Sequence, residues 1–418
     1  MSEQNTAKSP FTQGNAQKSN TTGRAPLFMP DRIAKKQIYD WICTDPYLDF
    51  LNYMHTRVIG QEEVTTIVTN VYSYLRRLVM PSMGIPSAPD ALVTTKSNAN
   101  NMLLCAPSGC GKTETYRALK DYFMERIPAL QIIITDVSNI TSTGFRGPDP
   151  ASIVEPLLAG GTHPVGIVFM DEFDKICIPS FTADHSNIHL EVQHNLLTMI
   201  EGAKVELRRG TIDTSNLLFI GTGSFDEFRK TRQEEKAKGI GFSMNGYEQK
   251  ETHDLPIRRE DMIQAGGCYE LIGRFSYIVN YHHLDRETLL AIIQKVKSGI
   301  ERDFGCEIVL EPKMMDYLYE NSNSKFGCRL LDSVMRDPVL RAYGDSLASQ
   351  KTGDVLVVTL QDSDMYSFGY REFTESERML QKIEENDLNE FQSDGTDYIS
   401  DDARRTFEEA LAALFMSQ

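Results

Sequence analysis

The sequence lacks long hydrophobic runs and closely spaced cysteines. No apolar stretch approaches the roughly eighteen residues that a membrane-spanning helix needs. Residues 1–30 show neither the apolar core of a secretory signal nor the arginine-rich pattern of a transit peptide. The seven cysteines include no C-x-x-C pair, which argues against a structural zinc site and against a disulfide framework. We therefore expect a cytoplasmic protein without a membrane partner.

Basic residues are also in the minority. The 418-residue chain carries 43 Lys and Arg against 59 Asp and Glu, a formal net charge of −16. This balance disfavours binding to nucleic-acid phosphates as the main task, so no nucleic-acid partner is expected. The acidic excess is concentrated in residues 361–418, which contain fifteen acidic and five basic residues.

Changes in composition along the chain indicate four regions. Residues 1–30 are polar with little apolar content, so we expect them to be disordered. Residues 31–280 contain helices and then short apolar strands alternating with helices, which predicts an α/β domain with a parallel sheet covered on both faces. Residues 281–361 indicate a smaller, mostly helical domain, and residues 362–418 an acidic extension.

The clearest motif is a phosphate-binding loop, Ala106-Pro-Ser-Gly-Cys-Gly-Lys-Thr113, between an apolar strand and a helix. Its glycines would let backbone N–H groups turn toward phosphates, and the helix dipole would favour the negative charge. Lys112 is expected to reach the β- and γ-phosphates and Thr113 to bind Mg²⁺. The nucleotide-contacting residues predicted in this segment are Ser108, Gly109, Cys110, Gly111, Lys112, Thr113 and Glu114.

A pair of carboxylates follows a second apolar strand, in Ile167-Val-Phe-Met-Asp-Glu172. Asp171 is expected to hold Mg²⁺, and Glu172 to polarise the attacking water as a catalytic residue. Two acids at the end of a strand often form only a solvated loop. In combination with the phosphate-binding loop, they predict ATP hydrolysis.

Several segments between about residues 56 and 360 resemble the ClpX and HslU unfoldases of the AAA+ class. The resemblance implies a P-loop NTPase fold with a smaller, mostly helical C-terminal domain, a homo-hexameric ring, protein substrates, and ATP with Mg²⁺ as cofactors. The family's four-cysteine zinc-binding domain has no counterpart in this sequence. The matching segments are Arg57–Gln61 (RVIGQ), Ile167–Ile176 (IVFMDEFDKI), Val192–Val205 (VQHNLLTMIEGAKV), Glu270–Phe275 (ELIGRF) and Gly327–Arg329 (GCR).

This resemblance assigns further roles at the nucleotide site. It implies that Val58 and Ile59 lie beside the adenine. It implies that Arg274 is an arginine finger acting from the adjacent subunit, and that Arg329 is a catalytic sensor-2 residue that also contacts the nucleotide. Taken alone, either arginine would more often be a surface ion-pair partner. Two nearby residues with hydroxyl groups, Thr222 and Ser224, are the candidates for the sensor-1 residue.

Gly144-Phe-Arg-Gly147 occupies the place of the family's pore loop. The resemblance implies that Phe145 grips an extended polypeptide in an axial channel. Arg146 stands where the family has an aliphatic residue, which suggests a different substrate preference, for instance toward acidic segments. The alternative is a tight turn with a buried Phe145.

Ile240, Gly241 and Phe242 occupy the place of the loop with which the family docks onto the ClpP peptidase ring. Large apolar side chains in a hydrophilic loop are costly to expose without a partner. The alternative is that Ile240 and Phe242 pack back onto their own domain.

The leading hypothesis is an ATP-dependent unfoldase that threads polypeptides through a hexameric pore into a ClpP-type peptidase. The runner-up is a peptidase-independent ATPase that remodels protein complexes and is recruited through the acidic extension.

Overall fold

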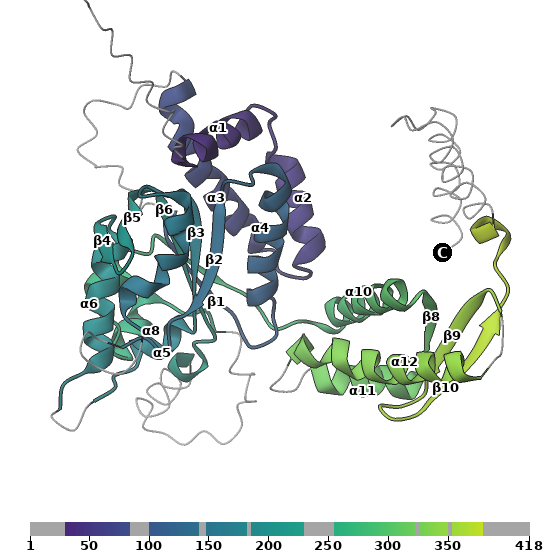
Figure 1. The fold of residues 1–418 in the computed structure, drawn as a ribbon. Helices are drawn as coiled ribbons and strands as arrows, with labels where there is room; N and C mark the ends of the chain where they lie inside the picture. The colour runs from purple at the N-terminus through teal and green to yellow at the C-terminus, as the bar shows by residue number, and fades with distance from the viewer. Residues whose placement is uncertain are drawn as a thin grey trace, which may run out of the picture.

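The chain forms two bodies joined by a short connection (Figure 1). The larger body ends at β7 (Tyr277–Asn280), and the smaller body begins at α10 (Arg286–Phe304). Phe145, Arg146 and the 240–242 segment lie outside the residues that the structure describes. The computed structural model describes residues 30–83, 100–141, 148–181, 185–229, 255–322, 327–349 and 353–378.

The larger body is built on a five-stranded parallel sheet with the order β2-β3-β6-β1-β7. Neighbouring residues of β1 enter opposite cores, since Met102 and Leu104 pack on one face and Leu103 and Cys105 on the other. A strand covered on both faces must be apolar throughout, because its side chains alternate between the faces. The predicted α/β fold is confirmed. The strands are β1 (Met102–Cys105), β2 (Gln131–Asp136), β3 (Gly166–Asp171), β6 (Leu217–Gly223) and β7.

Helices cover both faces of this sheet (Figure 1). Four of them, α1 to α4, share one apolar core, in which Trp41 makes edge-to-face contacts with Phe50 and Phe123. The helices of the opposite core follow β3 and β6 in the chain. The first set is α1 (Pro30–Ile42), α2 (Tyr47–Arg57), α3 (Val64–Val79) and α4 (Lys112–Arg126), with the 3-10 turn η1 (Met80–Met83). The second set is α5 (Phe173–Cys177), α6 (Ile188–Ile200), α8 (Arg259–Gln264) and α9 (Tyr269–Ile272).

Two local features of the larger body are irregular. Residues 150–160 form two 3-10 helices, η3 (Pro150–Ile153) and η4 (Glu155–Gly160), and not one continuous α-helix. Pro156 is the reason, since within a continuous α-helix it would remove a hydrogen bond and clash with the preceding turn. The residues after α6 form a two-stranded hairpin, β4 (Lys204–Leu207) with β5 (Gly210–Asp213), followed by η5 (Thr214–Asn216).

The smaller body packs helices against a three-stranded sheet with the order β10-β9-β8. Its last strand, β10 (Tyr366–Arg371), pairs antiparallel with the whole of β9. This strand lies within residues 362–418, the region predicted to be an acidic extension. Alternating aromatic residues at 366, 368 and 370 were the signal for this strand. Within the described part of the chain, no helix is both long enough and apolar enough to cross a membrane. The other elements are α10, β8 (Cys306–Leu310), α11 (Pro312–Ser322), η7 (Gly327–Leu330), α12 (Leu331–Ala348) and β9 (Val355–Leu360).

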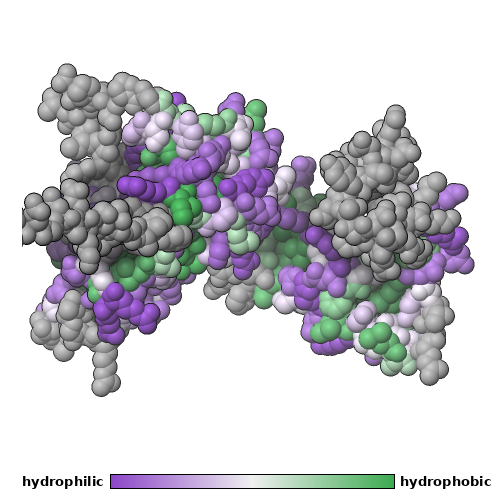
Figure 2. Space-filling view, turned by 45° about the horizontal axis from the view of Figure 1, so that its top comes forward, coloured by the Kyte–Doolittle hydropathy of each residue, from purple (hydrophilic) through white to green (hydrophobic). Residues whose placement is uncertain are grey.

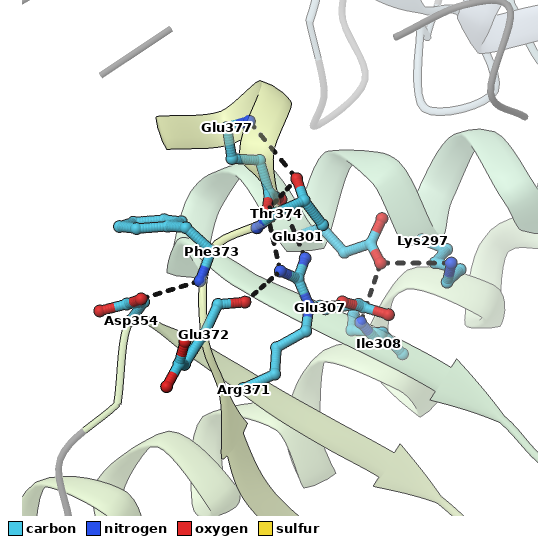
Figure 3. Close-up of polar contacts among 10 residues, drawn as sticks. All are labelled: Lys297, Glu301, Glu307, Ile308, Asp354, Arg371, Glu372, Phe373, Thr374 and Glu377. Carbon is cyan, nitrogen blue, oxygen red and sulfur yellow. Dashed lines mark hydrogen bonds and ion pairs between the residues drawn. The ribbon is translucent and has the colours of Figure 1, made fainter. Parts of the chain in front are cut away.

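A network of charged groups ties the chain beyond β10 to the smaller body (Figure 3). Arg371 donates to Glu307 on β8 at 2.5 Å and makes two hydrogen bonds, 2.8 and 2.9 Å long, to the carboxylate of Glu377. Glu377 also accepts from the backbone N–H of Thr374 at 2.7 Å, while its own N–H donates to the Thr374 hydroxyl at 3.3 Å. This reciprocal arrangement is a capping box, which starts a helical turn at residue 375.

Candidate nucleotide site at the domain junction

The loop from Ala106 to Gly111 connects β1 to α4 and depends on two left-handed glycines. Gly109 has φ +80° and Gly111 has φ +103°, conformations that other residues rarely adopt. A Cβ at Gly111 would also lie 3.3 Å from a methyl group of Val58. The loop therefore turns back tightly beneath the Val58 segment, and α4 begins directly at Lys112 with its N-terminus facing the loop.

Lys112 is folded over this loop. Its ammonium lies 2.6 Å from the carbonyl oxygen of Ala106 and 3.2 Å from that of Pro107. These contacts keep a positive charge beside the loop that leads into α4, whose N-terminus already favours anions. The loop can thus bind a phosphate group with both backbone and side-chain donors.

The segment that precedes α3 is held against the connection between the two bodies. The Gln61 side chain donates to the carbonyl oxygen of His282 at 2.8 Å and accepts from its backbone N–H at 3.0 Å. Gly60, with φ +75°, lies so close to Thr288 on α10 that a Cβ at this position would collide with that side chain. These contacts position Val58 and Ile59 beside the phosphate-binding loop.

A cavity of about 420 Å³ opens where these parts meet. In the space-filling view, hydrophobic surface is visible where the two bodies face one another (Figure 2). Eight residues of the cavity wall were predicted to bind the nucleotide, namely Val58, Ile59 and the six residues 109–114. Ser108 lies in the same loop but is not part of the wall. The wall consists of Arg57, Val58, Ile59, Gly109, Cys110, Gly111, Lys112, Thr113, Glu114, Arg117, Leu284, Ile292, Lys295, Val296, Gly299, Cys328 and Asp332.

The smaller body contributes a wall that sequence reasoning missed. Ile292, Val296 and Gly299 lie at helical spacing on α10 and face the cavity, and this spacing was the available signal. Lys295 donates to the carbonyl oxygens of Thr56 and Arg57, at 3.1 and 3.0 Å, at the C-terminal end of α2. A cation is favourable there because the last carbonyls of a helix lack partners. Burial lowers the pKa of Lys295.

The two carboxylates at the end of β3 have different surroundings. Asp171 Oδ1 accepts from the backbone N–H of Glu172 at 3.0 Å and from the Thr222 hydroxyl at 2.7 Å. Glu172 adopts a left-handed conformation, with φ +58°. Burial, with Asp174 and Asp171 adding to it, raises the pKa of Glu172. A raised pKa makes a carboxylate a better proton acceptor near neutral pH.

The two candidate sensor-1 hydroxyls have different partners. Thr222, on β6, bonds to Asp171, whereas Ser224 donates to the buried carboxylate of Asp174 at 3.2 Å. Asp174 also accepts from the backbone N–H of Phe225 at 3.1 Å, which fixes the turn after β6. Thr222 is thus the hydroxyl that contacts the predicted metal ligand.

Comparisons with known proteins identify similar chains. The family model "AAA domain (Cdc48 subfamily)" matches residues 97–278. The ATP-dependent Clp protease ATP-binding subunit ClpX of Porphyromonas gingivalis is 27% identical over 328 residues, 71% of this chain and 76% of that protein. ClpX of Azotobacter vinelandii is 30% identical over 321 residues, 69% of this chain and 71% of that protein. The chain belongs to the ClpX family. It is therefore an AAA+ ATPase that binds ATP.

In this ClpX-family chain, Arg274 does not lie on the cavity wall. It follows α9 and forms an ion pair with Glu201 at the end of α6, with 45% of its side chain exposed. The side chain of Arg329 lies outside the described residues, but the neighbouring Cys328 reaches the cavity wall. In the described part of the chain, no group of three or more His, Cys, Asp and Glu side chains could hold a metal ion.

The oxygen donors of the site nevertheless suit Mg²⁺, which usually keeps several waters and takes only one or two protein ligands. Thr113, on the cavity wall, and Asp171 are the predicted ligands. One oxygen of Asp171 accepts the two hydrogen bonds described above, which orients the carboxylate. Mg²⁺, when bound, would neutralise charge on the β- and γ-phosphates.

Proposed function

We propose that this ClpX-family ATPase unfolds proteins by threading them through the pore of a homo-hexamer and delivers them to a ClpP-type peptidase. The observation that carries the proposal is the position of the nucleotide cavity between the two bodies. A ligand that contacts both bodies favours one relative position of them, so binding and hydrolysis can drive movement. The name shared by these relatives, ATP-dependent Clp protease ATP-binding subunit, supports the peptidase partner.

Each residue of the site has a place in the proposed hydrolysis step. Lys112 and the loop N–H groups would bind the β- and γ-phosphates, and Thr113 and Asp171 would hold Mg²⁺. Glu172 would accept a proton from the attacking water, while Thr222 orients Asp171. Val58 and Ile59 would contact the adenine, with Ser108 to Gly111 and Glu114 nearby.

Arginines would stabilise the charge that develops on the transferred phosphoryl group. Arg274 lies half-exposed and off the wall of its own cavity, which suits action on the nucleotide of a neighbouring subunit. Arg329 would act from the smaller body of the same subunit, next to Cys328 on the wall. Phe145 and Arg146 would contact the polypeptide in the pore, and Ile240, Gly241 and Phe242 would dock onto the peptidase.

The test is ATP-dependent degradation of a folded, tagged fluorescent substrate by the purified protein mixed with a ClpP-type peptidase. We expect degradation with the natural protein, none with Glu172→Gln, and loss in Phe242→Ala while its ATPase activity is retained. Phe145→Ala should also lose degradation. Full degradation by Phe242→Ala would remove the docking role. Absence of any unfolding in the presence of hydrolysis would contradict the proposal.

A second function is favoured by the hydrogen bonds from Arg371, on β10, to Glu377 and Glu307, which anchor the chain beyond β10 on the smaller body (Figure 3). Because this body forms part of the cavity wall, the extension is attached to a part that would move with the nucleotide. Such an arm suits recruitment of protein complexes for remodelling without a peptidase. Deletion of residues 379–418 distinguishes the two: it should abolish remodelling but leave peptidase-coupled degradation of a tagged substrate unchanged.

A further inference from the structure

Two cysteines line the nucleotide cavity, one from each body. Cys110 lies in the phosphate-binding loop, between the left-handed Gly109 and Gly111. Cys328 lies in η7, at the start of the smaller body's α12 segment. Both face the space in which the nucleotide is expected, so a covalent link between them would affect binding directly.

These two thiols differ from the other cysteines among the described residues. Cys105, Cys177 and Cys268 are buried in one core of the larger body, Cys306 is buried in the core of the smaller body, and Cys43 is exposed. Cys110 is buried at the base of the cavity, where its thiol lies 3.9 Å from the Ser108 carbonyl oxygen. Cys328 is half-buried.

The environment of both thiols makes them slow to react while the cavity keeps this shape. Burial raises the pKa of Cys110 to about 11. Burial, with a smaller contribution from the neighbouring Cys110 thiol, raises the pKa of Cys328 to about 11. The thiolate is the reactive form, so at neutral pH reaction needs an opening movement that admits water. A bound nucleotide would fill the cavity and oppose this opening movement.

We propose that Cys110 and Cys328 form a reversible dithiol–disulfide site that inactivates the ATPase by linking the two bodies across the nucleotide cavity. A low-molecular-weight disulfide such as oxidised glutathione is the oxidant. One cysteine thiolate attacks it, forming a protein–glutathione mixed disulfide and releasing one glutathione. The second cysteine attacks the protein sulfur and releases the other glutathione. The protein loses two thiol protons and two electrons, and the oxidant becomes two thiols.

The linked state is incompatible with nucleotide binding for a geometric reason. A disulfide holds the two Cα atoms about 4.4–6.8 Å apart, so the smaller body would be fixed against the phosphate-binding loop. The backbone around Cys110 could then no longer surround a phosphate. This inference depends on the ATPase site alone and not on unfolding, pore threading or a peptidase.

The full-length protein is incubated with oxidised glutathione, with and without ATP, and its ATPase activity is measured before and after dithiothreitol. We expect loss of activity without ATP, protection by ATP and recovery with dithiothreitol. Mass spectrometry of the unreduced digest should find the Cys110 peptide joined to the Cys328 peptide. Glutathione on these cysteines without the cross-link would overturn the proposal.

Variants separate this site from general thiol damage, each compared with its own untreated sample. Cys328→Ser and Cys328→Ala should resist inactivation, whereas Cys43→Ser, which changes an exposed cysteine away from the cavity, should remain as sensitive as the natural protein. Untreated ATPase activity serves as the check that each variant is folded. Equal inactivation of both Cys328 variants and the natural protein would contradict the proposed link.

Discussion

The two sides of the nucleotide cavity are built on different physical grounds. On the larger body, the wall is a loop whose backbone conformation is set by Gly109 and Gly111 and whose charges come from Lys112. On the smaller body, the wall is the apolar face of α10, with Lys295 as the polar link to α2. The residues predicted to carry out hydrolysis belong to the larger body, whereas the contacts from the smaller body couple the two bodies. Variants on the two sides should therefore fail in different ways.

The largest effect is expected on the chemical side, from Glu172→Gln. Removal of the proton acceptor should slow hydrolysis by about 10²–10⁴-fold. ATP binding should persist, since the phosphate-binding loop is untouched. Single-turnover hydrolysis and nucleotide binding would be measured in parallel. The control is Glu191→Gln, which changes an exposed carboxylate on α6 and should leave both quantities unchanged.

Lys295→Ala tests the wall of the cavity that α10 of the smaller body forms. It removes two hydrogen bonds from a charged donor to the end of α2. Bonds of this kind contribute about 1.5–3 kcal/mol each. Because they join the two walls of the cavity, ATP should bind at least tenfold more weakly without them. Titration with a fluorescent ATP analogue would measure this. Lys297→Ala is the matched control, because Lys297 also lies on α10 but pairs with Glu301 of the same helix. Equal affinity for both variants would show that this wall does not contribute to binding.

Thr222→Val and Ser224→Ala compare the two candidate sensor-1 hydroxyls. Loss of the hydrogen bond from Thr222 to Asp171 should lower the hydrolysis rate by about tenfold, a typical value for a bond to a charged group. Ser224→Ala should reduce stability but change the rate of the folded protein little, since Ser224 bonds to Asp174. Steady-state ATPase assays on both variants decide between them. A larger rate loss in Ser224→Ala would reverse the assignment.

The smallest effect is expected away from the cavity, at Glu377. The Arg371 hydrogen bonds lower the pKa of Glu377 to about 2, below its ordinary value of 4.5. A depressed folded-state pKa contributes stability that is present above the unfolded value and lost as pH falls toward the folded one. For such a partly exposed pair, about 1 kcal/mol or less is expected. Glu377→Ala should therefore lower the thermal midpoint at pH 7 but not at pH 2, whereas Arg378→Ala should change it little.

The sequence predicted one side of the cavity far better than the other. The phosphate-binding loop, the Asp171–Glu172 pair and the parallel sheet have local signatures, because their chemistry requires particular residues at fixed spacing. The α10 wall has no such signature: Ile292 and Val296 are ordinary core-type residues whose position depends on how the smaller body packs. The 3-10 helices at 150–160 and strand β10 were missed for a related reason, since Pro156 and the pairing with β9 override the local pattern.

Mixing two inactive variants tests most directly whether neighbouring subunits share each nucleotide site. Glu172→Gln lacks the proton acceptor but retains Arg274, and Arg274→Ala retains Glu172. If Arg274 acts on the neighbouring subunit's nucleotide, rings that contain both variants include complete sites, and ATPase activity should reappear on mixing. Activity no greater than the sum of the two variants, in rings shown to contain both, would contradict a shared site.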